Sequence, residues 1–403
     1  MKQAEGPVKA ASFLCPPSLR EEFAGALAFG IGRTRENVAR FGKEFPHVTD
    51  AAGRWRMLPA TLPVDWEVPG RRMPHGNWTA GFWVGLLWIA YEETGEETFR
   101  NAALRWSEHL EPRKHDLTTQ AVGFLFYPSF VRGYGISGDP RLRATALRAA
   151  DSLWRRYNPR ARLIQAWGPL SHPELDGWCN IDSMMNVPLL WWAHRETGRE
   201  IYRDVALDHS RTVGARLIRS DGASYHMGKF DPESGEFLEG GTLQGLNPSS
   251  CWARGQAWTV YGFALAYAAT REPDLLAIAE SGSEYFLRNL PPDRVPYWDF
   301  GLSPGMRPPR DSSAGAIGAS GLIELSRTHP DPARGLRYWE SALGLLSALT
   351  RSCLSRSRAE QEGILLHGAY SVPHNEGVDS SVIWGDYYYL EALQKVSRFS
   401  VDH

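Results

Sequence analysis

The chain has 403 residues, of which 43% are hydrophobic and 22% charged, and its formal net charge is -2. This composition is typical of a soluble globular protein, and the near-neutral charge gives no general attraction for nucleic acid or for an anionic membrane. The N-terminus has no apolar stretch of the kind found in secretion signals, no apolar run is long enough to span a bilayer, and the four cysteines are widely spaced. We therefore expect a cytoplasmic protein with reduced thiols that binds neither nucleic acid nor membranes.

Apolar residues at three-to-four spacing predict helices along most of the chain. We expect a weakly ordered tail at 1–18 and a single domain at 19–403, with a long loop at 43–76. The predicted helices are 19–42, 81–94, 98–110, 118–137, 140–157, 179–197, 200–218, 252–270, 273–289, 312–328, 332–354 and 380–398. Apolar helices alternate with amphipathic ones, which favours an inner ring wrapped by an outer ring: an all-α (α/α)6 barrel of six helical hairpins. The alternative is an irregular all-helical bundle.

Only one segment between these helices has the pattern of β-structure. Residues 224–227 and 235–238 are joined through a turn at 231–235 and predict one small β-hairpin.

Asp182 is the only acid in an apolar run, Trp178 to Trp192. The run predicts the first turns of a buried helix. Burial raises the pKa of a carboxyl group, and a carboxyl that stays protonated near neutral pH can donate a proton to a substrate. The alternative is an Asp that caps the helix or pairs with a buried Arg.

Aromatic and polar residues recur together in the segments that precede the predicted inner helices. In an (α/α)6 barrel these segments line one end. Aromatic faces beside fixed polar groups make a surface suited to carbohydrate, whereas each Trp taken singly could be core. The segments include Asn77–Trp83, Gln165–Gly168, Ser224–His226, Gly240–Gly245, Arg254–Trp258, Tyr297–Phe300, Arg310–Ser313 and Ile383–Tyr389.

Other chemistries lack their motifs. The sequence contains no HExxH, P-loop, GxSxG or dinucleotide-binding glycine pattern, and its histidines do not have metal-ligand spacing. We expect no metal and no organic cofactor.

From about Ser18 to the C-terminus the chain resembles glycoside hydrolase family 88, the unsaturated glucuronyl hydrolases. Eleven strings carry the resemblance in order, among them Trp78–Trp83, Gln165–Pro169, Gly240–Gly245, Arg254–Phe263 and Ile383–Leu393. The resemblance implies the same barrel and an enzyme that removes a 4,5-unsaturated uronic acid from lyase-generated di- or oligosaccharides. In the family a carboxylic acid protonates C4, water adds at C5, and the resulting hemiketal opens with loss of the aglycone.

The resemblance also implies roles for particular residues. Asp182 matches the acid/base position. The positions that match substrate-binding residues are His226, Gly240, Thr242, Gln244, Arg254 and Trp258, and Trp78 and Trp167 are expected to stack on sugar rings. We expect Arg254 to contact an anion, because a guanidinium grips a carboxylate with two hydrogen bonds. The alternative for Arg254 is a structural ion pair inside the barrel.

The chain departs from the family at Gln120 and Ala121, where the family has His and a second catalytic Asp. A neighbouring negative charge raises the pKa of an acid, so without it Asp182 should ionise more readily. Loss of a group that acts with the acid costs about 10²–10⁴ in rate. Ala121 has two explanations, an engineered change or a natural loss or alteration of activity. The intact Val122–Leu125 segment beside it favours the engineered change. Gln120 indicates natural variation in substrate preference.

Three hypotheses follow. The first is an unsaturated glucuronyl hydrolase, inactivated in this form at Ala121; the second is an unsaturated rhamnogalacturonyl hydrolase on the same barrel. The third is a non-catalytic protein that binds unsaturated sugars. A sugar 2-epimerase is disfavoured because we find no paired His bases. The expected partner is an unsaturated uronic-acid di- or oligosaccharide, bound by a monomer or homodimer.

Overall fold

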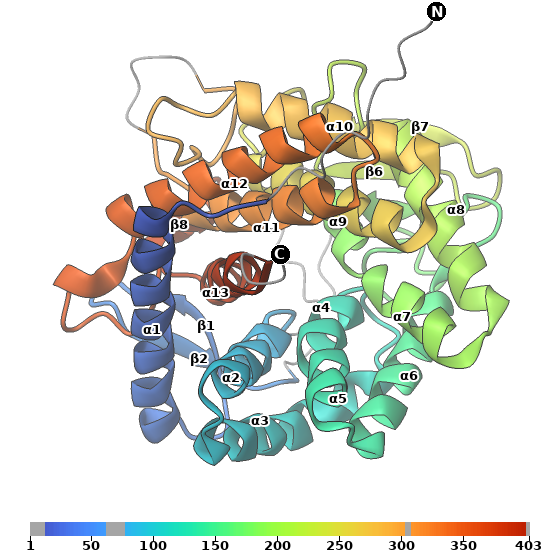
Figure 1. The fold of residues 1–403 in the computed structure, drawn as a ribbon. Helices are drawn as coiled ribbons and strands as arrows, with labels where there is room; N and C mark the ends of the chain where they lie inside the picture. Colours follow the sequence, from blue (N-terminus) through green and yellow to red (C-terminus); the bar gives the residue numbers. More distant parts are fainter. Residues whose placement is uncertain (1–12, 62–76, 303–307, 400–403) are drawn as a thin grey trace, which may run out of the picture.

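A computed structural model describes residues 13–61, 77–302 and 308–399. Two rings of helices form a barrel, as predicted (Figure 1). The inner ring contains α2 (Ala80–Thr94), α4 (Val122–Phe126) continued by the π-helix η2 (Tyr127–Val131) and α5 (Arg132–Ser137), α7 (Pro188–Thr197), α9 (Ala253–Thr270), α11 (Ser312–Thr328) and α13 (Ile383–Phe399). The outer ring contains α1 (Pro17–Arg40), α3 (Glu97–Leu110), α6 (Pro140–Trp154), α8 (Glu200–Leu217), α10 (Pro273–Arg288) and α12 (Pro332–Ser352).

The two rings differ in how their helices bury side chains. In α9 nearly every residue from Ala253 to Tyr267 is buried, because the helix contacts protein on all sides. In α10 only one stripe is buried, formed by Leu275, Ala279, Gly282, Ser283 and Phe286. This difference is what the alternation of apolar and amphipathic segments predicted.

The turns between helices use the residues that the sequence singled out. Gly95, Gly138 and Gly198 end α2, α5 and α7 with φ of 70°, 66° and 69°, a conformation that costs glycine little. Asp139 accepts a hydrogen bond from the Arg141 N–H at the start of α6, and Pro140 occupies the first turn. No helix in the three described ranges is both long and apolar enough to cross a membrane.

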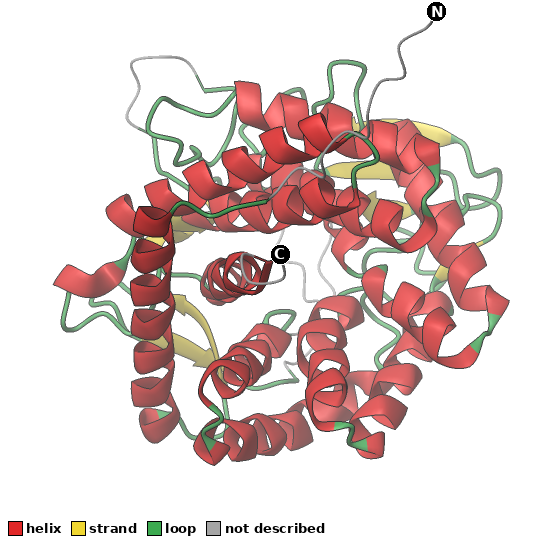
Figure 2. Ribbon diagram, in the orientation of Figure 1, coloured by secondary structure: helices red, strands yellow, loops and turns green. Residues whose placement is uncertain are grey.

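The barrel carries more β-structure than the single predicted hairpin. That hairpin is present as β6 (Met227–Phe230) and β7 (Phe237–Gly241), and β5 (Trp178–Asn180) joins it in a three-stranded antiparallel sheet. Three two-stranded sheets are added, namely β1 (Phe45–Thr49) with β2 (Trp55–Leu58), β3 (Tyr157–Asn158) with β4 (Leu163–Ile164), and β8 (Gly368–Ser371) with β9 (Glu376–Ser380). All are short (Figure 2). Strands of two to five residues leave too few alternating positions to be recognised in a sequence.

Three further expectations need correction. The predicted loop at 43–76 contains the β1–β2 hairpin, and its remainder, 62–76, lies outside the described residues. The predicted helix at 179–197 begins as strand β5 and a 3₁₀ turn, η3 (Ile181–Met185), before α7. Residues 1–12 of the predicted tail lie outside the described residues, and α1 begins at Pro17.

Candidate active site

Backbone pairing brings distant segments together at one end of the barrel, which we call the mouth. The N–H of Gln120 donates to the carbonyl of Ala166 (3.0 Å), and the N–H of Ala166 donates to the carbonyl of Trp178 (2.8 Å). Trp178 starts β5, which pairs with β6, and β6 pairs with β7. Because each segment hydrogen-bonds the next, the predicted site residues near positions 120, 167, 182, 226 and 240 lie in one row.

Asp182 lies at the end of this row, where β5 turns into η3. Its side chain is 17% exposed, and its Oδ1 is buried without a hydrogen-bond partner. Burial raises the pKa of Asp182 to about 7, although the positive charge of Arg254 opposes the rise. The carboxyl group therefore carries a proton in a large fraction of molecules at neutral pH, and Oδ1 is not engaged in a hydrogen bond within the protein.

His226 is held as a neutral donor next to Asp182. Its Nδ1 accepts from the N–H groups of Leu243 (3.2 Å) and Gln244 (3.3 Å), and lies 3.4 Å from the hydroxyl of Thr242. With Nδ1 as the acceptor, the proton must sit on Nε2, which lies 3.9 Å from Asp182 Oδ1. Burial lowers the pKa of His226 to about 3, so the ring stays neutral.

The loop after β7 keeps His226 in this state. The hydroxyl of Thr242 accepts from the N–H of Gly245 (2.7 Å), and the Gln244 side chain donates to the carbonyl of Tyr370 (3.0 Å). A Cβ on Gly240 would lie 2.6 Å from the Tyr225 ring, so only glycine allows this close approach. The predicted residues Gly240, Thr242 and Gln244 therefore shape the wall beside the histidine.

Gln120 and Ala121 lie just before α4, and Gln120 contacts the strand β5 that leads to Asp182. The Gln120 amide nitrogen donates to Asn180 Oδ1, while its oxygen is buried without a partner. Ala121 is 7% exposed, and its N–H donates to the hydroxyl of Thr119 (3.0 Å). At these two positions the chain presents the methyl group of Ala121 and a Gln120 amide oxygen that accepts no hydrogen bond within the protein.

Arg254 is engaged by the protein. It is 1% exposed, forms an ion pair with Asp311 (2.8 Å), and donates to the carbonyls of Ala369 and Tyr370. The indole rings of Trp252 and Trp384 lie 4.3 Å and 5.2 Å from its guanidinium carbon. These contacts fit the structural ion pair considered from the sequence, and they leave Nε as its one nitrogen without a partner.

The three predicted tryptophans occupy different depths. Trp258 is 0% exposed and packs against Phe124 and Tyr388 in the core. Trp78 is 9% exposed and lies 5.0 Å, centroid to centroid, from Trp384. Trp167 is 7% exposed and belongs to a small apolar cluster separate from the main core. Trp78 and Trp167 therefore keep a small exposed surface, whereas Trp258 is fully enclosed by the core.

Three residues at the mouth were not among the predicted site residues. Asn180 holds Gln120, Trp252 stacks on His226 with ring centroids 4.4 Å apart, and Tyr370 accepts from Gln244 and Arg254 through its carbonyl. Asn180 and Trp252 each lie two residues from a predicted residue, so proximity was an available signal. Tyr370 lies in the β8–β9 hairpin, which the sequence did not reveal.

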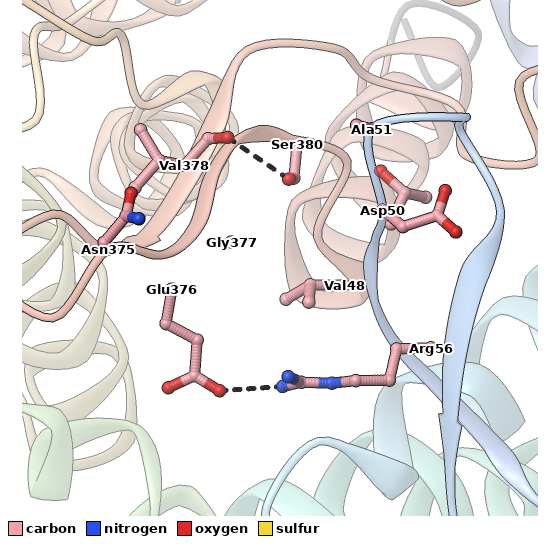
Figure 3. Close-up of a pocket in the computed structure, with 10 residues that line it drawn as sticks. Val48, Asp50, Ala51, Arg56, Asn375, Glu376, Gly377, Val378 and Ser380 are labelled. Carbon is pink, nitrogen blue, oxygen red and sulfur yellow. Dashed lines mark hydrogen bonds and ion pairs between the residues drawn. The ribbon is translucent and has the colours of Figure 1, made fainter.

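A separate hollow of about 300 Å³ lies between the β1–β2 and β8–β9 hairpins (Figure 3). Arg56 and Glu376 form an ion pair across it (2.8 Å), and none of the predicted site residues lines it. Within the described ranges, no three His, Cys, Asp or Glu side chains gather closely enough to hold a metal ion.

Comparisons with known proteins agree on one family. The model of Glycosyl Hydrolase Family 88 matches residues 54–281. The unsaturated glucuronyl hydrolase of Bacillus sp. (strain GL1) is 40% identical over 379 residues, 93% of this chain and 96% of that protein. An unsaturated chondroitin disaccharide hydrolase of Streptococcus pyogenes serotype M1 is 37% identical, covering 93% of this chain and 91% of its own. An unsaturated glucuronyl hydrolase variant solved with dGlcA-Glc-Rha-Glc superimposes with a TM-score of 0.86 at 39% identity, covering 93% of this chain and 96% of that one.

Proposed function

The chain belongs to glycoside hydrolase family 88, and we propose that its site binds and hydrates a 4,5-unsaturated glucuronic acid at the non-reducing end of a di- or oligosaccharide. The observation that carries the proposal is the Asp182 carboxyl group, which is buried, has a pKa raised to about 7 and keeps Oδ1 without a hydrogen-bond partner. A protonated acid whose oxygen is not held by another hydrogen bond is what protonation of C4 requires.

In the proposed reaction Asp182 gives its proton to C4, and positive charge develops at C5 and the ring oxygen. The resulting carboxylate then takes a proton from the water that adds at C5, and the hemiketal opens with release of the aglycone. His226 Nε2–H, 3.9 Å from Asp182 Oδ1, is positioned to stabilise the carboxylate between these steps. The neutral state of His226 matters, because a charged imidazolium would lower the pKa of Asp182, and Asp182 would then lose its proton before it could protonate C4.

The residues around Asp182 supply the remaining contacts. We assign hydroxyl recognition to the Gln120 amide oxygen, which is buried without a partner, and ring stacking to Trp78 and Trp167. We assign Arg254 to binding only through its Nε, since its other nitrogens are held by Asp311 and backbone carbonyls. A cytoplasmic location and a monomeric or homodimeric state stay predictions of the sequence.

Ala121 favours a second candidate, a protein that binds the unsaturated sugar without turning it over. The relatives support unsaturated glucuronyl hydrolase over unsaturated rhamnogalacturonyl hydrolase. The choice between hydrolysis and binding depends on whether Asp182 can act without a second carboxylate.

The test is the near-ultraviolet absorbance of unsaturated disaccharides, which vanishes when the C4=C5 bond is hydrated. We expect the Ala121→Asp variant to turn over at least one disaccharide about 10²–10⁴ times faster than the unaltered chain. Adding Asp182→Asn to that variant should abolish turnover while binding persists. If Ala121→Asp is inert towards every disaccharide that the chain binds, the binding protein is the correct assignment.

A further inference from the structure

The β5–β6–β7 sheet has one face against α8 of the barrel and an opposite, outer face that is buried at Asn180 and Met227 and partly or fully exposed at Trp178, Lys229 and Glu239. A Cβ on Gly228 would meet Leu217 of α8 at 2.8 Å, so Gly228 and its partner Cys179 face the barrel. Directly paired residues share a face, and the next pair along the strands lies on the other face. The outer face therefore carries the paired residues Trp178, Lys229 and Glu239 and, next to them, Asn180, Met227 and Gly241.

This outer face continues from the candidate active site. Asn180 holds Gln120 and lies two residues before Asp182. Trp178 lies two residues earlier on the same strand, about 7 Å further from the acid. Trp167 and Met227 form a buried apolar cluster with Ala166, and Trp178 and Leu243 pack against it. An apolar strip thus leads away from Asp182, first past Trp167 and then to Trp178.

The Trp178 ring is fixed in place before any ligand binds. Its Nε1 donates to the carbonyl of Glu174 (3.2 Å), and its ring lies 5.0 Å from Lys229 Nζ. That ammonium donates to the carbonyls of Asp176 (2.5 Å) and Glu174 (3.3 Å). The indole is only partly buried, so part of its surface remains available. A rigid aromatic ring binds a partner with little loss of side-chain freedom.

The charges around this ring do not suit an anion. Glu174 and Glu239 are exposed, and the ammonium of Lys229 is already occupied by two carbonyls. A carboxylate or sulfate placed here would meet more negative than positive charge, whereas a neutral sugar would meet the part of the indole that Lys229 and the apolar cluster leave uncovered.

We propose that Trp178 forms a further sugar subsite, which takes a neutral pyranose ring of the aglycone, the third sugar counted from the unsaturated end. The inference rests on the proposed function, because it places the unsaturated sugar at Asp182 and the second sugar at Trp167. A related structure holds the tetrasaccharide dGlcA-Glc-Rha-Glc, so an aglycone of this length is compatible with this barrel. The subsite makes the protein favour oligosaccharides over disaccharides.

The test is a comparison of dissociation constants, measured by calorimetry, for an unsaturated disaccharide and a tetrasaccharide with neutral sugars beyond the first. In the unaltered chain the tetrasaccharide should bind more tightly. Trp178→Ala should reduce this preference about three- to tenfold, and Trp178→Phe, which keeps an aromatic face, should restore part of it. The matched control is Leu238→Ala on β7, an exposed side chain (55%) outside the strip, which should leave the preference unchanged.

Thermal melting of each variant shows whether it is folded. If Trp178→Ala is unfolded, the comparison uses Trp178→Phe in its place. An unchanged preference in the folded Trp178 variants would overturn the subsite and leave the proposed function standing. If the unaltered chain binds neither sugar, both proposals fail. A tetrasaccharide with a uronate as its third sugar should bind more weakly than the neutral one, and equal or tighter binding would refute the preference for a neutral ring.

Discussion

Two buried carboxyl groups show why a raised pKa alone does not identify an acid catalyst. Burial raises the pKa of both Asp182 and Asp386 to about 7. The two oxygens of Asp386 accept the N–H groups of Ile364 and Leu365 (2.8 Å each), so this carboxyl group organises the start of α13. Asp182 Oδ1 has no hydrogen-bond partner within the protein. This unused oxygen, more than the pKa, favours Asp182 over Asp386 as the proposed acid.

The first prediction concerns the pH dependence of turnover. The proposed mechanism needs Asp182 protonated in the complex with substrate, and its pKa is raised to about 7. The rate of the Ala121→Asp variant should therefore fall about tenfold per pH unit above the pKa of the acid, and the restored carboxylate should move that pKa upward. Initial rates between pH 5 and 9 measure this, and a rate that rises with pH over that range would contradict Asp182 as the acid.

The second prediction concerns stability. The pKa of Asp182 is higher in the folded protein, about 7, than its ordinary value of 3.8. The contribution of this group to stability therefore falls as the pH rises from about 4 through 7, because the buried group must then ionise. Asp182→Asn removes this term, so at pH 8 the variant should be more stable by about 1–4 kcal/mol. Urea unfolding at pH 8 and pH 4 tests this, since the difference should shrink at the lower pH.

At the scale of elements, one glycine fixes the distance between α4 and η3. A Cβ on Gly123 would lie 2.2 Å from the Cα of Asn186, and Asn186 accepts the Phe124 N–H through its side chain. Helix α4 thus contacts the end of the turn that carries Asp182. The Val122–Leu125 string that matched the family therefore has a packing reason of its own.

The third prediction compares two glycines of the same helical run. Gly123→Ala should force α4 away from η3, lower stability by about 1–3 kcal/mol and weaken sugar binding. Gly135→Ala is the control, because a Cβ there meets nothing within 4 Å. In the helix interior that change should be neutral or stabilise by up to about 1 kcal/mol. Equal effects of the two changes on stability and binding would show that the close contact between Gly123 and Asn186 is not needed for either property.

The sequence predicted most of the helices well, because the long ones leave ten or more residues of apolar periodicity, and several end at Gly or begin at Asp-Pro. It predicted the barrel for the same reason. The row of short β segments was largely missed, since β5 has three residues and the pairing of Gln120 with Ala166 is a single hydrogen bond. Contacts such as Asn180 with Gln120 arise from this pairing, so they could not be inferred from spacing along the chain.

At the scale of the whole molecule, a buried ion pair joins separate parts of the mouth. Arg254 is on α9, Asp311 caps α11, and both contact the backbone of Ala369 on β8. Neither side chain is exposed by more than 1%. The pair therefore links two inner helices and a hairpin behind His226.

The fourth prediction follows from this link. Asp311→Ala leaves the guanidinium of Arg254 buried without its counter-charge, which should cost about 3–5 kcal/mol of stability. Arg211→Ala is the control, because its ion pairs with Glu272 and Asp274 are exposed and should contribute less than about 1 kcal/mol. Chemical unfolding of the two variants measures the difference, and similar losses would mean that the buried pair does not stabilise the mouth.

One main apolar core runs through the barrel, from Phe23 of α1 to Val396 of α13. Helix α1 also contacts α12 and α13, so the first and last helices of the chain close the ring together. A ligand in the proposed site would contact segments that lead into several inner helices. Binding there should stabilise the whole barrel and not one part of it.

The fifth prediction is that the chain unfolds in a single transition and that bound sugar raises the temperature of that whole transition. At a free concentration one hundred times the dissociation constant, a bound unsaturated disaccharide should add about 2.7 kcal/mol to the free energy of unfolding. Near-ultraviolet circular dichroism, which reports the tryptophans, and far-ultraviolet circular dichroism, which reports the helices, should shift together on heating. A saturated disaccharide of the same composition is the control and should shift neither signal as far. Two separate transitions, with only one shifted by the sugar, would show that the mouth and the helical rings do not form one cooperative unit.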